Sequence, residues 1–388
     1  MKLAEHSVRK MTPAAQDGTP DGEECGLIFC RIEEGLARVR EEVPIGTLFL
    51  VADEEGFSFF SPYAGAPRTF NMVTDGADAL PLFSAPDGVT CICAAGGTNL
   101  LRCARYFAEI NRIPCYLFPA FASCDGAEEE CGEVCVGSTK SEFPLAPARV
   151  MCDISVVKGG SAAYARILIS RLALFEQRVL RAFCGAETGD LYERAYVAAL
   201  SVNEESTLKE LISANAALRR LEGRGMYAGE GIALARMLEK DGADNPEWQA
   251  YMQLSALYAA FFKRGEPRRY FVPDYALRAL RAGEGESGYL RAKIPTPNEY
   301  AFRAIALEKM RALFLHELEA LLGKREAQAR KFRLLNGGGT ERMENVLYRL
   351  RYLPEYEPKG FCAVIRDFGL MEWQYGEESI SADNKITN

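Results

Sequence analysis

The sequence predicts a parallel α/β domain followed by a mostly helical domain. Residues 89–118 place two apolar runs on either side of a segment with apolar residues at helical spacing, and two glycines precede that segment. This order of strand, turn, helix and strand is the unit of a parallel sheet with right-handed crossovers. From about residue 161 onward, long segments with helical periodicity dominate. Since 388 residues exceed what one compact core usually holds, two domains are expected.

The chain divides into four parts on this basis. We expect a loose, disordered lead-in, a sheet domain, a helical domain and a polar tail, at residues 1–26, 27–158, 159–375 and 376–388 respectively. In the sheet domain, an amphipathic helix is predicted at 28–42, and strands and a hairpin are predicted at 47–52, 68–73, 89–94, 113–118, 134–143 and 150–157. Helices of the second domain are predicted at 162–183, 191–201, 207–221, 229–240, 247–263, 298–322 and 341–350.

Composition excludes several classes of function. The net charge of -8 argues against a broad nucleic-acid interface, which needs clustered Lys and Arg. No apolar run approaches the length of a membrane span, and residues 1–24 lack the apolar core of a signal peptide. We therefore expect a cytoplasmic protein whose partner is a small molecule, with neither nucleic acid nor membrane. A homodimer is one state that the sequence allows.

The glycine turn after the strand at 89–94 is the main candidate binding element. Gly96 and Gly97 would let a phosphate approach the backbone, and the helix that begins at Thr98 and Asn99 would offer free N–H groups and the positive end of its dipole. Two adjacent glycines also serve simply to reverse the chain. The local pattern leaves both interpretations open.

The wider context resembles the iron-containing alcohol dehydrogenase superfamily, which includes glycerol dehydrogenase, glycerol-1-phosphate dehydrogenase and dehydroquinate synthase. The motifs that carry the resemblance are LFLVAD (48–53), AGGTN (95–99), IPCYLFPA (113–120), SCDG (123–126) and PARVMCDISVV (147–157). They cover the first 160 residues or so and stand in the family's order. The resemblance implies a Rossmann-like nucleotide domain and an NAD(P)-dependent oxidoreductase acting on a small polyol or polyol phosphate.

The resemblance also implies a set of residues that bind NAD or NADP. They are Asp53, Gly96, Gly97, Thr98, Asn99, Ser123 and Asp125. An acidic side chain at position 53 would meet the adenosine ribose and repel a 2'-phosphate, although a loop or helix-capping role is equally consistent with Asp at a strand end. Leu101 and Ala120 replace polar residues that the family places near the cofactor.

The family's metal site is not expected in this chain. Metal-dependent members use one Asp and two His, but this chain has only two histidines, His6 in the lead-in and His316 in a helical segment. The position of the ligand Asp falls at residues 169–171, and the segment at 229–236 lacks both family histidines. Cys124, Cys131 and Cys135 are spaced more loosely than a Cys-x-x-Cys pair, so no metal is expected there either, and whether they bind anything stays open.

Three cations are weak candidates for catalysis. Arg171 and Arg236 occupy positions near the missing ligands, and a guanidinium could supply positive charge to an alkoxide or hold a phosphate. Lys158, before the glycines that lead into the helical domain, could reach a phosphate. The simpler interpretation treats the arginines as surface residues that form salt bridges. Three functions follow as alternatives: a metal-free oxidoreductase, an inactive relative that binds a nucleotide or phosphometabolite as a sensor or partner subunit, and a structural protein without a small ligand.

Overall fold

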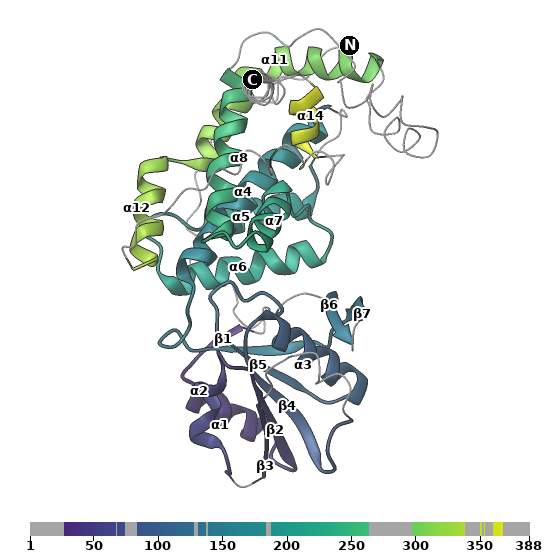
Figure 1. The fold of residues 1–388 in the computed structure, drawn as a ribbon, viewed down its shortest axis with the longest axis vertical. Coiled ribbons are helices and arrows are strands. Elements are labelled where there is room, and N and C mark those ends of the chain that lie inside the picture. The colour runs from purple at the N-terminus through teal and green to yellow at the C-terminus, as the bar shows by residue number, and fades with distance from the viewer. Residues whose placement is uncertain are drawn as a thin grey trace, which may run out of the picture.

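The computed structural model describes residues 27–66, 68–73, 84–127, 131–136, 139–183, 188–263, 297–337 and 360–367, together with Leu350 and Leu353. Figure 1 shows two lobes, a sheet lobe formed by the first half of the chain and a helical lobe formed by the second half. This is the α/β domain followed by a helical domain that the sequence predicts. The predicted domain boundaries stay a prediction, and the predicted lead-in and tail lie outside the described residues.

The sheet lobe is built on six parallel strands. They are β1 (Leu27–Phe29), β2 (Thr47–Ala52), β3 (Thr69–Val73), β4 (Val89–Gly96), β5 (Cys115–Pro119) and β8 (Ala148–Cys152), in the spatial order β1-β8-β5-β4-β2-β3. Parallel sheets are covered on both faces, which explains why β2, β4 and β5 are almost wholly apolar and buried. The predicted hairpin is confirmed as the antiparallel pair β6 (Cys131–Val136) and β7 (Thr139–Pro144).

Helices cover the two faces of the sheet. Along β2, Phe49 and Val51 join the core packed beneath α3 (Thr98–Asn111), while Leu48 and Leu50 join the core beneath α1 (Ile32–Glu42) and α2 (Phe57–Phe60). This alternation follows from the two-residue period of a strand. A short 3-10 helix, η1 (Ser61–Tyr63), follows α2.

The predicted helix at 28–42 is corrected at its start. Residues 27–29 form β1, which pairs with β8, and the helix begins only at Ile32. Asp153, just after β8, accepts a hydrogen bond from the Ile32 N–H at 3.0 Å. A carboxylate at the first helical N–H groups stabilises a helix start, so the end of β8 determines where α1 begins.

The helical lobe packs around one long central helix. Its described helices are α4 (Gly160–Phe183), α5 (Asp190–Leu200), α6 (Leu208–Gly223), α7 (Glu230–Lys240), α8 (Pro246–Lys263), α11 (Pro297–Leu322), α12 (Arg325–Leu335) and α14 (Phe361–Asp367). Each of the others in this list contacts α4. The sequence did not predict α12 or α14, and the predicted helix at 341–350 lies almost wholly outside the described residues.

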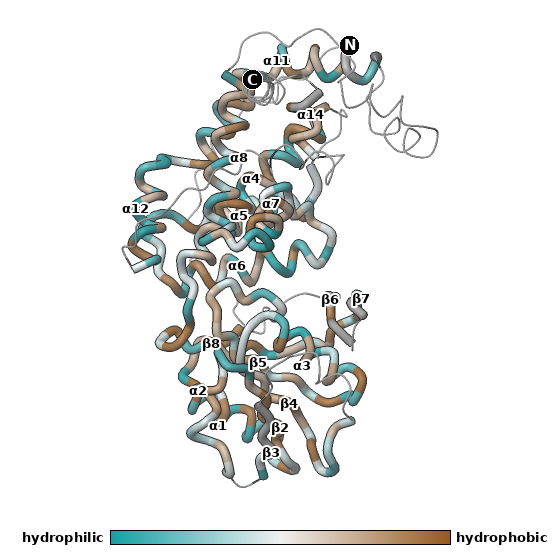
Figure 2. The backbone as a smooth tube through the Cα atoms, viewed as in Figure 1, coloured by the Kyte–Doolittle hydropathy of each residue, from teal (hydrophilic) through white to brown (hydrophobic). Residues whose placement is uncertain are grey.

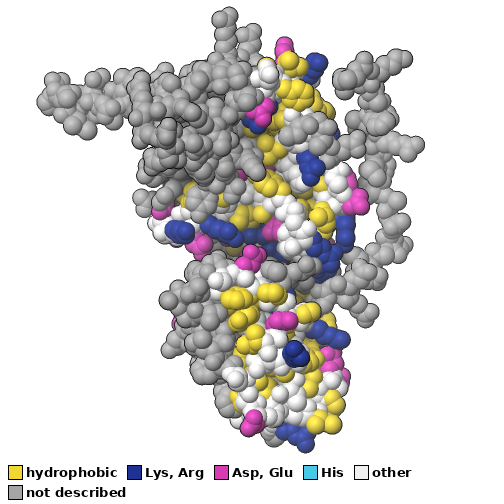
Figure 3. Space-filling model, turned by 90° about the vertical axis from the view of Figure 1, so that its right-hand side faces the viewer, with side chains coloured by type: hydrophobic (Ala, Val, Ile, Leu, Met, Phe, Trp, Pro, Cys, Tyr) yellow, Lys and Arg dark blue, Asp and Glu magenta, His cyan; other side chains and the backbone are white. Residues whose placement is uncertain are grey.

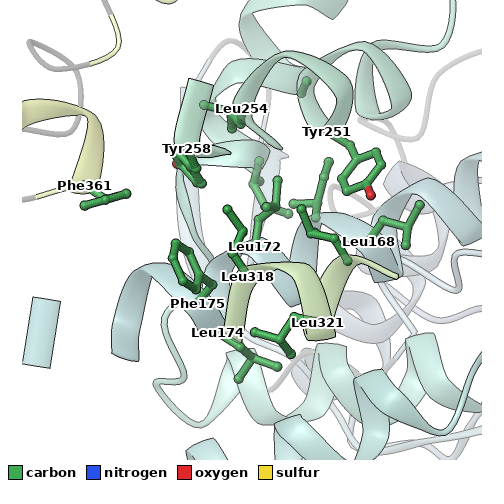
Figure 4. Packing of buried hydrophobic residues seen from close by; sticks show 14 of the residues in the cluster. Leu168, Leu172, Leu174, Phe175, Tyr251, Leu254, Tyr258, Leu318, Leu321 and Phe361 are labelled. Carbon is green, nitrogen blue, oxygen red and sulfur yellow. The ribbon is translucent and has the colours of Figure 1, made fainter. Parts of the chain in front are cut away.

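The core of the helical lobe is aliphatic and aromatic. Figure 4 shows Leu172 and Phe175 of α4 facing Leu254 and Tyr258 of α8, with Leu318 of α11 beside them. Figure 2 shows hydrophobic residues along the strands of the sheet and along the inner helices of this lobe. None of the described helices is both long and apolar enough to cross a membrane.

The two lobes share a core where α4 and α6 meet the sheet lobe. Ala163 of α4 and Ile212 and Ala216 of α6 are fully buried in the same cluster as residues of β4, β5 and α3. Asn215 Nδ2 donates a hydrogen bond to the Ala163 carbonyl oxygen at 3.0 Å. Small residues at this contact let the two helices approach the sheet lobe closely.

We expect the helical lobe to depend on the ring of Phe175, which is fully buried and contacts Phe262, Phe314 and Phe361. Phe175→Ala should lower the free energy of unfolding by about 3–5 kcal/mol, because a large cavity replaces the ring. Denaturant unfolding followed by circular dichroism measures the change. Val197→Ala, at a side chain that is 69% exposed, is the control and should have little effect; equal effects of the two changes would contradict this prediction.

Candidate functional site

The glycine turn lies at the carboxyl end of β4, directly before α3. A Cβ atom at Gly96 would lie 2.4 to 2.5 Å from the carboxyl atoms of Asp53, and one at Gly56 would lie 1.9 Å from the Ala95 carbonyl oxygen. Neither distance is tolerable for a side chain. The absence of side chains at both glycines therefore allows the loop after β2 to close onto the turn after β4.

The Asp53 carboxylate holds this closure. Its Oδ1 accepts a hydrogen bond from the Gly56 N–H at 2.9 Å, and its Oδ2 accepts one from the Gly97 N–H at 2.8 Å. Both oxygens therefore bind backbone of the protein itself, which corresponds to the loop and capping role that the sequence left open. Each oxygen keeps a further lone pair, so a ribose hydroxyl remains a compatible partner.

The first turn of α3 offers backbone donors. No side chain caps this helix at its start, and the first intrahelical bond near the turn runs from the Leu101 N–H to the Gly97 carbonyl oxygen. The N–H groups of Thr98, Asn99 and Leu100 precede that bond, so they have no partner within the helix. They lie at the positive end of a 14-residue helix, where an anion is favoured.

The loop after β5 lies against the same helix start. Gly126 has φ of +82°, and a Cβ there would lie 2.7 Å from the Thr98 carbonyl oxygen. Arg105 of α3 fixes the loop by donating hydrogen bonds to the carbonyl oxygens of Gly126 at 3.2 Å and Ala146 at 2.7 Å. The structure thus brings the loop that carries Ser123 and Asp125 beside the glycine turn.

Phe121 covers the glycine turn, and the sequence analysis missed it. Its ring lies 3.4 Å from the position of a Cβ at Gly97 and 3.5 Å from that of a Cβ at Gly159. Backbone bonds fix its place, since the Ala120 N–H binds the Gly96 carbonyl oxygen at 2.9 Å. An aromatic residue in a small-residue loop was the available signal. The ring makes one wall of the approach to the turn apolar.

Lys158 lies at the same edge of the sheet. Its Nζ is 2.7 Å from Glu55 Oε2, and both side chains are substantially exposed. An exposed pair of this kind contributes little to stability because water and salt screen it. The pair joins the loop after β8 to the loop after β2.

Arg171 is not the surface residue of the simpler interpretation. It is buried in the helical lobe, and its guanidinium donates hydrogen bonds to the carbonyl oxygens of Ala199 at 3.1 Å, Leu321 at 3.4 Å and Val202. These carbonyls lie at or just past the carboxyl ends of α5 and α11, where the helix dipole favours a cation. Arg236 is exposed on α7. Neither arginine belongs to the glycine turn.

The described residues do not fit the metal ion used by the family that the sequence resembles. No group of three His, Cys, Asp or Glu side chains capable of holding a metal occurs among the described residues. His316 is exposed on α11, and His6 lies outside the described part of the chain. Cys124 is buried, while the side chains of Cys131 and Cys135 are not described. No catalytic step is therefore assigned to a metal.

A buried pair of carboxyl groups in the helical lobe was also missed. Glu176 of α4 and Glu230 of α7 are fully buried, and Tyr258 Oη lies 2.7 Å from Glu176 Oε1 and 3.0 Å from Glu230 Oε2. The Glu230 N–H donates to Glu176, and the Cys362 N–H donates to Glu230. Burial and, after it, the neighbouring Glu230 raise the pKa of Glu176 from 4.5 to about 8. The pair thus holds a proton near neutral pH.

This raised pKa predicts a pH dependence of stability. A carboxyl group whose pKa is higher in the folded state binds more protons when folded, so stability falls as pH rises from about 4.5 to about 8. Glu176→Gln should flatten that decline, because the amide stays neutral. Urea unfolding at several pH values measures it. Glu193→Gln, at an exposed position on α5, should keep the parent's decline, and an unchanged decline in Glu176→Gln would contradict the prediction.

Comparison with known proteins gives matches to solved structures alone. No family model and no curated protein matches the sequence. An iron-containing alcohol dehydrogenase from Corynebacterium glutamicum is 14% identical, with 78% of this chain and 96% of that chain covered and a TM-score of 0.44. Glycerol dehydrogenase from Schizosaccharomyces pombe is 14% identical, with 81% and 92% covered and a TM-score of 0.41.

A third match is sulfoacetaldehyde reductase from Bifidobacterium kashiwanohense in complex with NAD+, 13% identical, with 79% of this chain and 90% of that chain covered and a TM-score of 0.41. At such identities the likeness concerns the fold.

Proposed function

We propose that this chain binds a nicotinamide dinucleotide, NAD or NADP, at the glycine turn and acts as an oxidoreductase on a small polyol or polyol phosphate without the family's metal ion. The observation that carries the proposal is the uncapped first turn of α3, where the N–H groups of Thr98, Asn99 and Leu100 have no partner within the helix. The class of reaction comes from the resemblance of the sequence.

The chain's own residues would divide the binding work as follows. The N–H groups of Thr98 and Asn99 would hold the pyrophosphate, and Asp53 would keep the turn in place through Gly97 while accepting a ribose hydroxyl. Phe121 would exclude water from one side of the turn. A bound nicotinamide supplies the hydride chemistry itself.

A second candidate is a relative that binds the nucleotide or a phosphometabolite but does not catalyse a reaction. Three observations favour it. Arg171 donates its hydrogen bonds to backbone carbonyl oxygens, Arg236 is exposed, and Lys158 forms an ion pair with Glu55. The two arginines lie in the helical lobe, away from the glycine turn, and the charge of Lys158 is paired. Such a chain would serve as a sensor or partner subunit.

The nucleotide site is tested with Gly97→Asp. The backbone at Gly97 has φ of −85°, which any residue adopts, and a Cβ there would have ordinary contacts, so the variant should fold. Its carboxylate would repel a phosphate at the helix start. NAD or NADP should raise the melting temperature of the parent, and this shift should vanish in the variant.

Gly189→Asp is a matched control, because Gly189 also precedes a helix, α5, and a Cβ there meets open space. It should keep the dinucleotide shift. A shift that survives in Gly97→Asp, or no shift in the parent, would refute the nucleotide site.

Turnover separates the two candidate functions. Parent protein that shows a dinucleotide shift is incubated with NAD or NADP and a panel of polyols and polyol phosphates, and the absorbance of the reduced nicotinamide is followed. Reduction that is lost in Gly97→Asp and kept in Gly189→Asp supports the oxidoreductase. Binding without reduction of any panel member supports the second candidate.

A further inference from the structure

The loop that carries Ser123 and Asp125 is surrounded by four arginines. On the sheet side, Arg105 of α3 donates to the Gly126 carbonyl oxygen, and the Cγ atom of Arg102 would lie 3.2 Å from a Cβ at Gly126. From the helical lobe, Arg219 of α6 and Arg166 of α4 face Asp125. Figure 3 shows Lys and Arg side chains gathered at the level where the two lobes meet, with Asp and Glu among them.

Arg166 has no hydrogen-bonding partner for its Nε, although this atom is buried. Burial and then the neighbouring Arg219 lower the pKa of its guanidinium to about 10. A buried polar atom that lacks a hydrogen bond is costly, so proteins rarely retain one for stability alone. Arg166 lies one helical turn after Ala163, where α4 contacts the sheet lobe.

Arg219 is only partly satisfied. Its side chain is 2% exposed; Nη1 binds Glu222 and Nη2 lies 3.5 Å from Ser170 Oγ. Its Nε is buried without a hydrogen bond and lies 3.9 Å from Asp125 Oδ1, which is too far for one. Like Arg166, it lies close to the inter-lobe contact, one turn after Ala216.

The carboxylates nearby do not complete this pair of arginines. Asp125 pairs with the charge of Arg219 but lies too far from its Nε for a hydrogen bond. Glu222 binds Nη1 of Arg219 and also attracts Arg166, yet it accepts a hydrogen bond from neither Nε. Glu247 of α8 also faces Arg166, but burial raises its pKa, which weakens it as a counter-ion. Two Nε donors thus remain without acceptors in one buried place.

We propose that Arg166 and Arg219 bind the phosphate group of a small ligand between the two lobes. A phosphate offers several acceptor oxygens at once and matches the geometry of guanidinium groups. Because Gly126 contacts the start of α3, this phosphate would lie next to the glycine turn. We assign this phosphate to the substrate, which rests on the proposed function. The substrate would then be a polyol phosphate and not an uncharged polyol.

The test measures the melting temperature of the full chain at constant ionic strength with inorganic phosphate, glycerol phosphate and glycerol. Phosphate and glycerol phosphate should raise it, and glycerol at the same concentrations should not. In Arg166→Met the apparent Kd for phosphate should rise about tenfold or more, since a charge-assisted hydrogen bond is lost. Arg219→Lys keeps the charge but loses Nε and should weaken binding as well.

Arg194→Gln, an exposed arginine on α5, is the control and should bind phosphate as the parent does. The ligand-free Arg166→Met protein should melt at or above the parent's temperature, because the substitution removes a buried Nε that has no acceptor. A purely structural arginine would instead give a lower melting temperature. Absence of a phosphate shift in the parent, an unchanged shift in both arginine variants, or a clearly lower melting temperature with unchanged phosphate affinity would overturn the proposal.

The dinucleotide shift in the same variants separates this inference from the proposed function. Loss of the phosphate shift in Arg166→Met with an intact NAD or NADP shift places the phosphate site apart from the dinucleotide site, as proposed. Phosphate binding that depends on the arginines in a protein without any dinucleotide shift would refute the proposed function and still support the phosphate site. Loss of both shifts in Arg166→Met would assign the arginines to the dinucleotide and overturn the substrate assignment.

Discussion

The geometry of the candidate site depends on the two hydrogen bonds of the Asp53 carboxylate. They fix the loop after β2 against the turn after β4, and Gly56 and Gly96 make the approach possible because neither carries a side chain. The direction in which the first turn of α3 presents its donors follows from this closure. A negative charge beside the Gly97 N–H also sets a limit on the site, because a second anion must bind further along the helix start.

Three arginines of the helical lobe differ in how many of their hydrogen-bond donors the protein satisfies. Arg171 binds three carbonyl oxygens, so its charge is balanced by the ends of two helices. Arg219 is balanced on one edge by Glu222, and Arg166 lacks an acceptor for its Nε. The degree of satisfaction follows position, since the balanced arginine lies within the helical core and the other two lie beside the contact with the sheet lobe. Residue type alone therefore says little about the role of an arginine in this chain.

Local patterns in the sequence were sufficient for much of the sheet lobe and for most long helices. Apolar runs and the glycine turn predicted β4, α3 and β5. In strands and helices of that length, the spacing of apolar residues in the sequence shows which side chains are buried. Contacts between side chains that are far apart in the sequence could not be predicted from local patterns. In the sequence, Glu176 is a single charged residue within an apolar helical segment, and its partner Glu230 is 54 residues away. Arg171 was misjudged for the same reason, since its acceptors come from two other helices. The Nε atoms of Arg166 and Arg219 become buried without an acceptor only when α4 and α6 pack in the folded chain.

The position of β1 has a consequence for how the chain acquires its fold. This three-residue strand lies at the edge of the sheet and pairs with β8 alone, Leu27 opposite Val150. Among the strands it is made first, yet its neighbour emerges from the ribosome some 120 residues later. The central strands β2, β4 and β5 can associate before that, while the first strand must wait unpaired. Completion of the sheet is thus coupled to synthesis of the segment that leads into the helical lobe, and contacts of such long sequence separation form slowly.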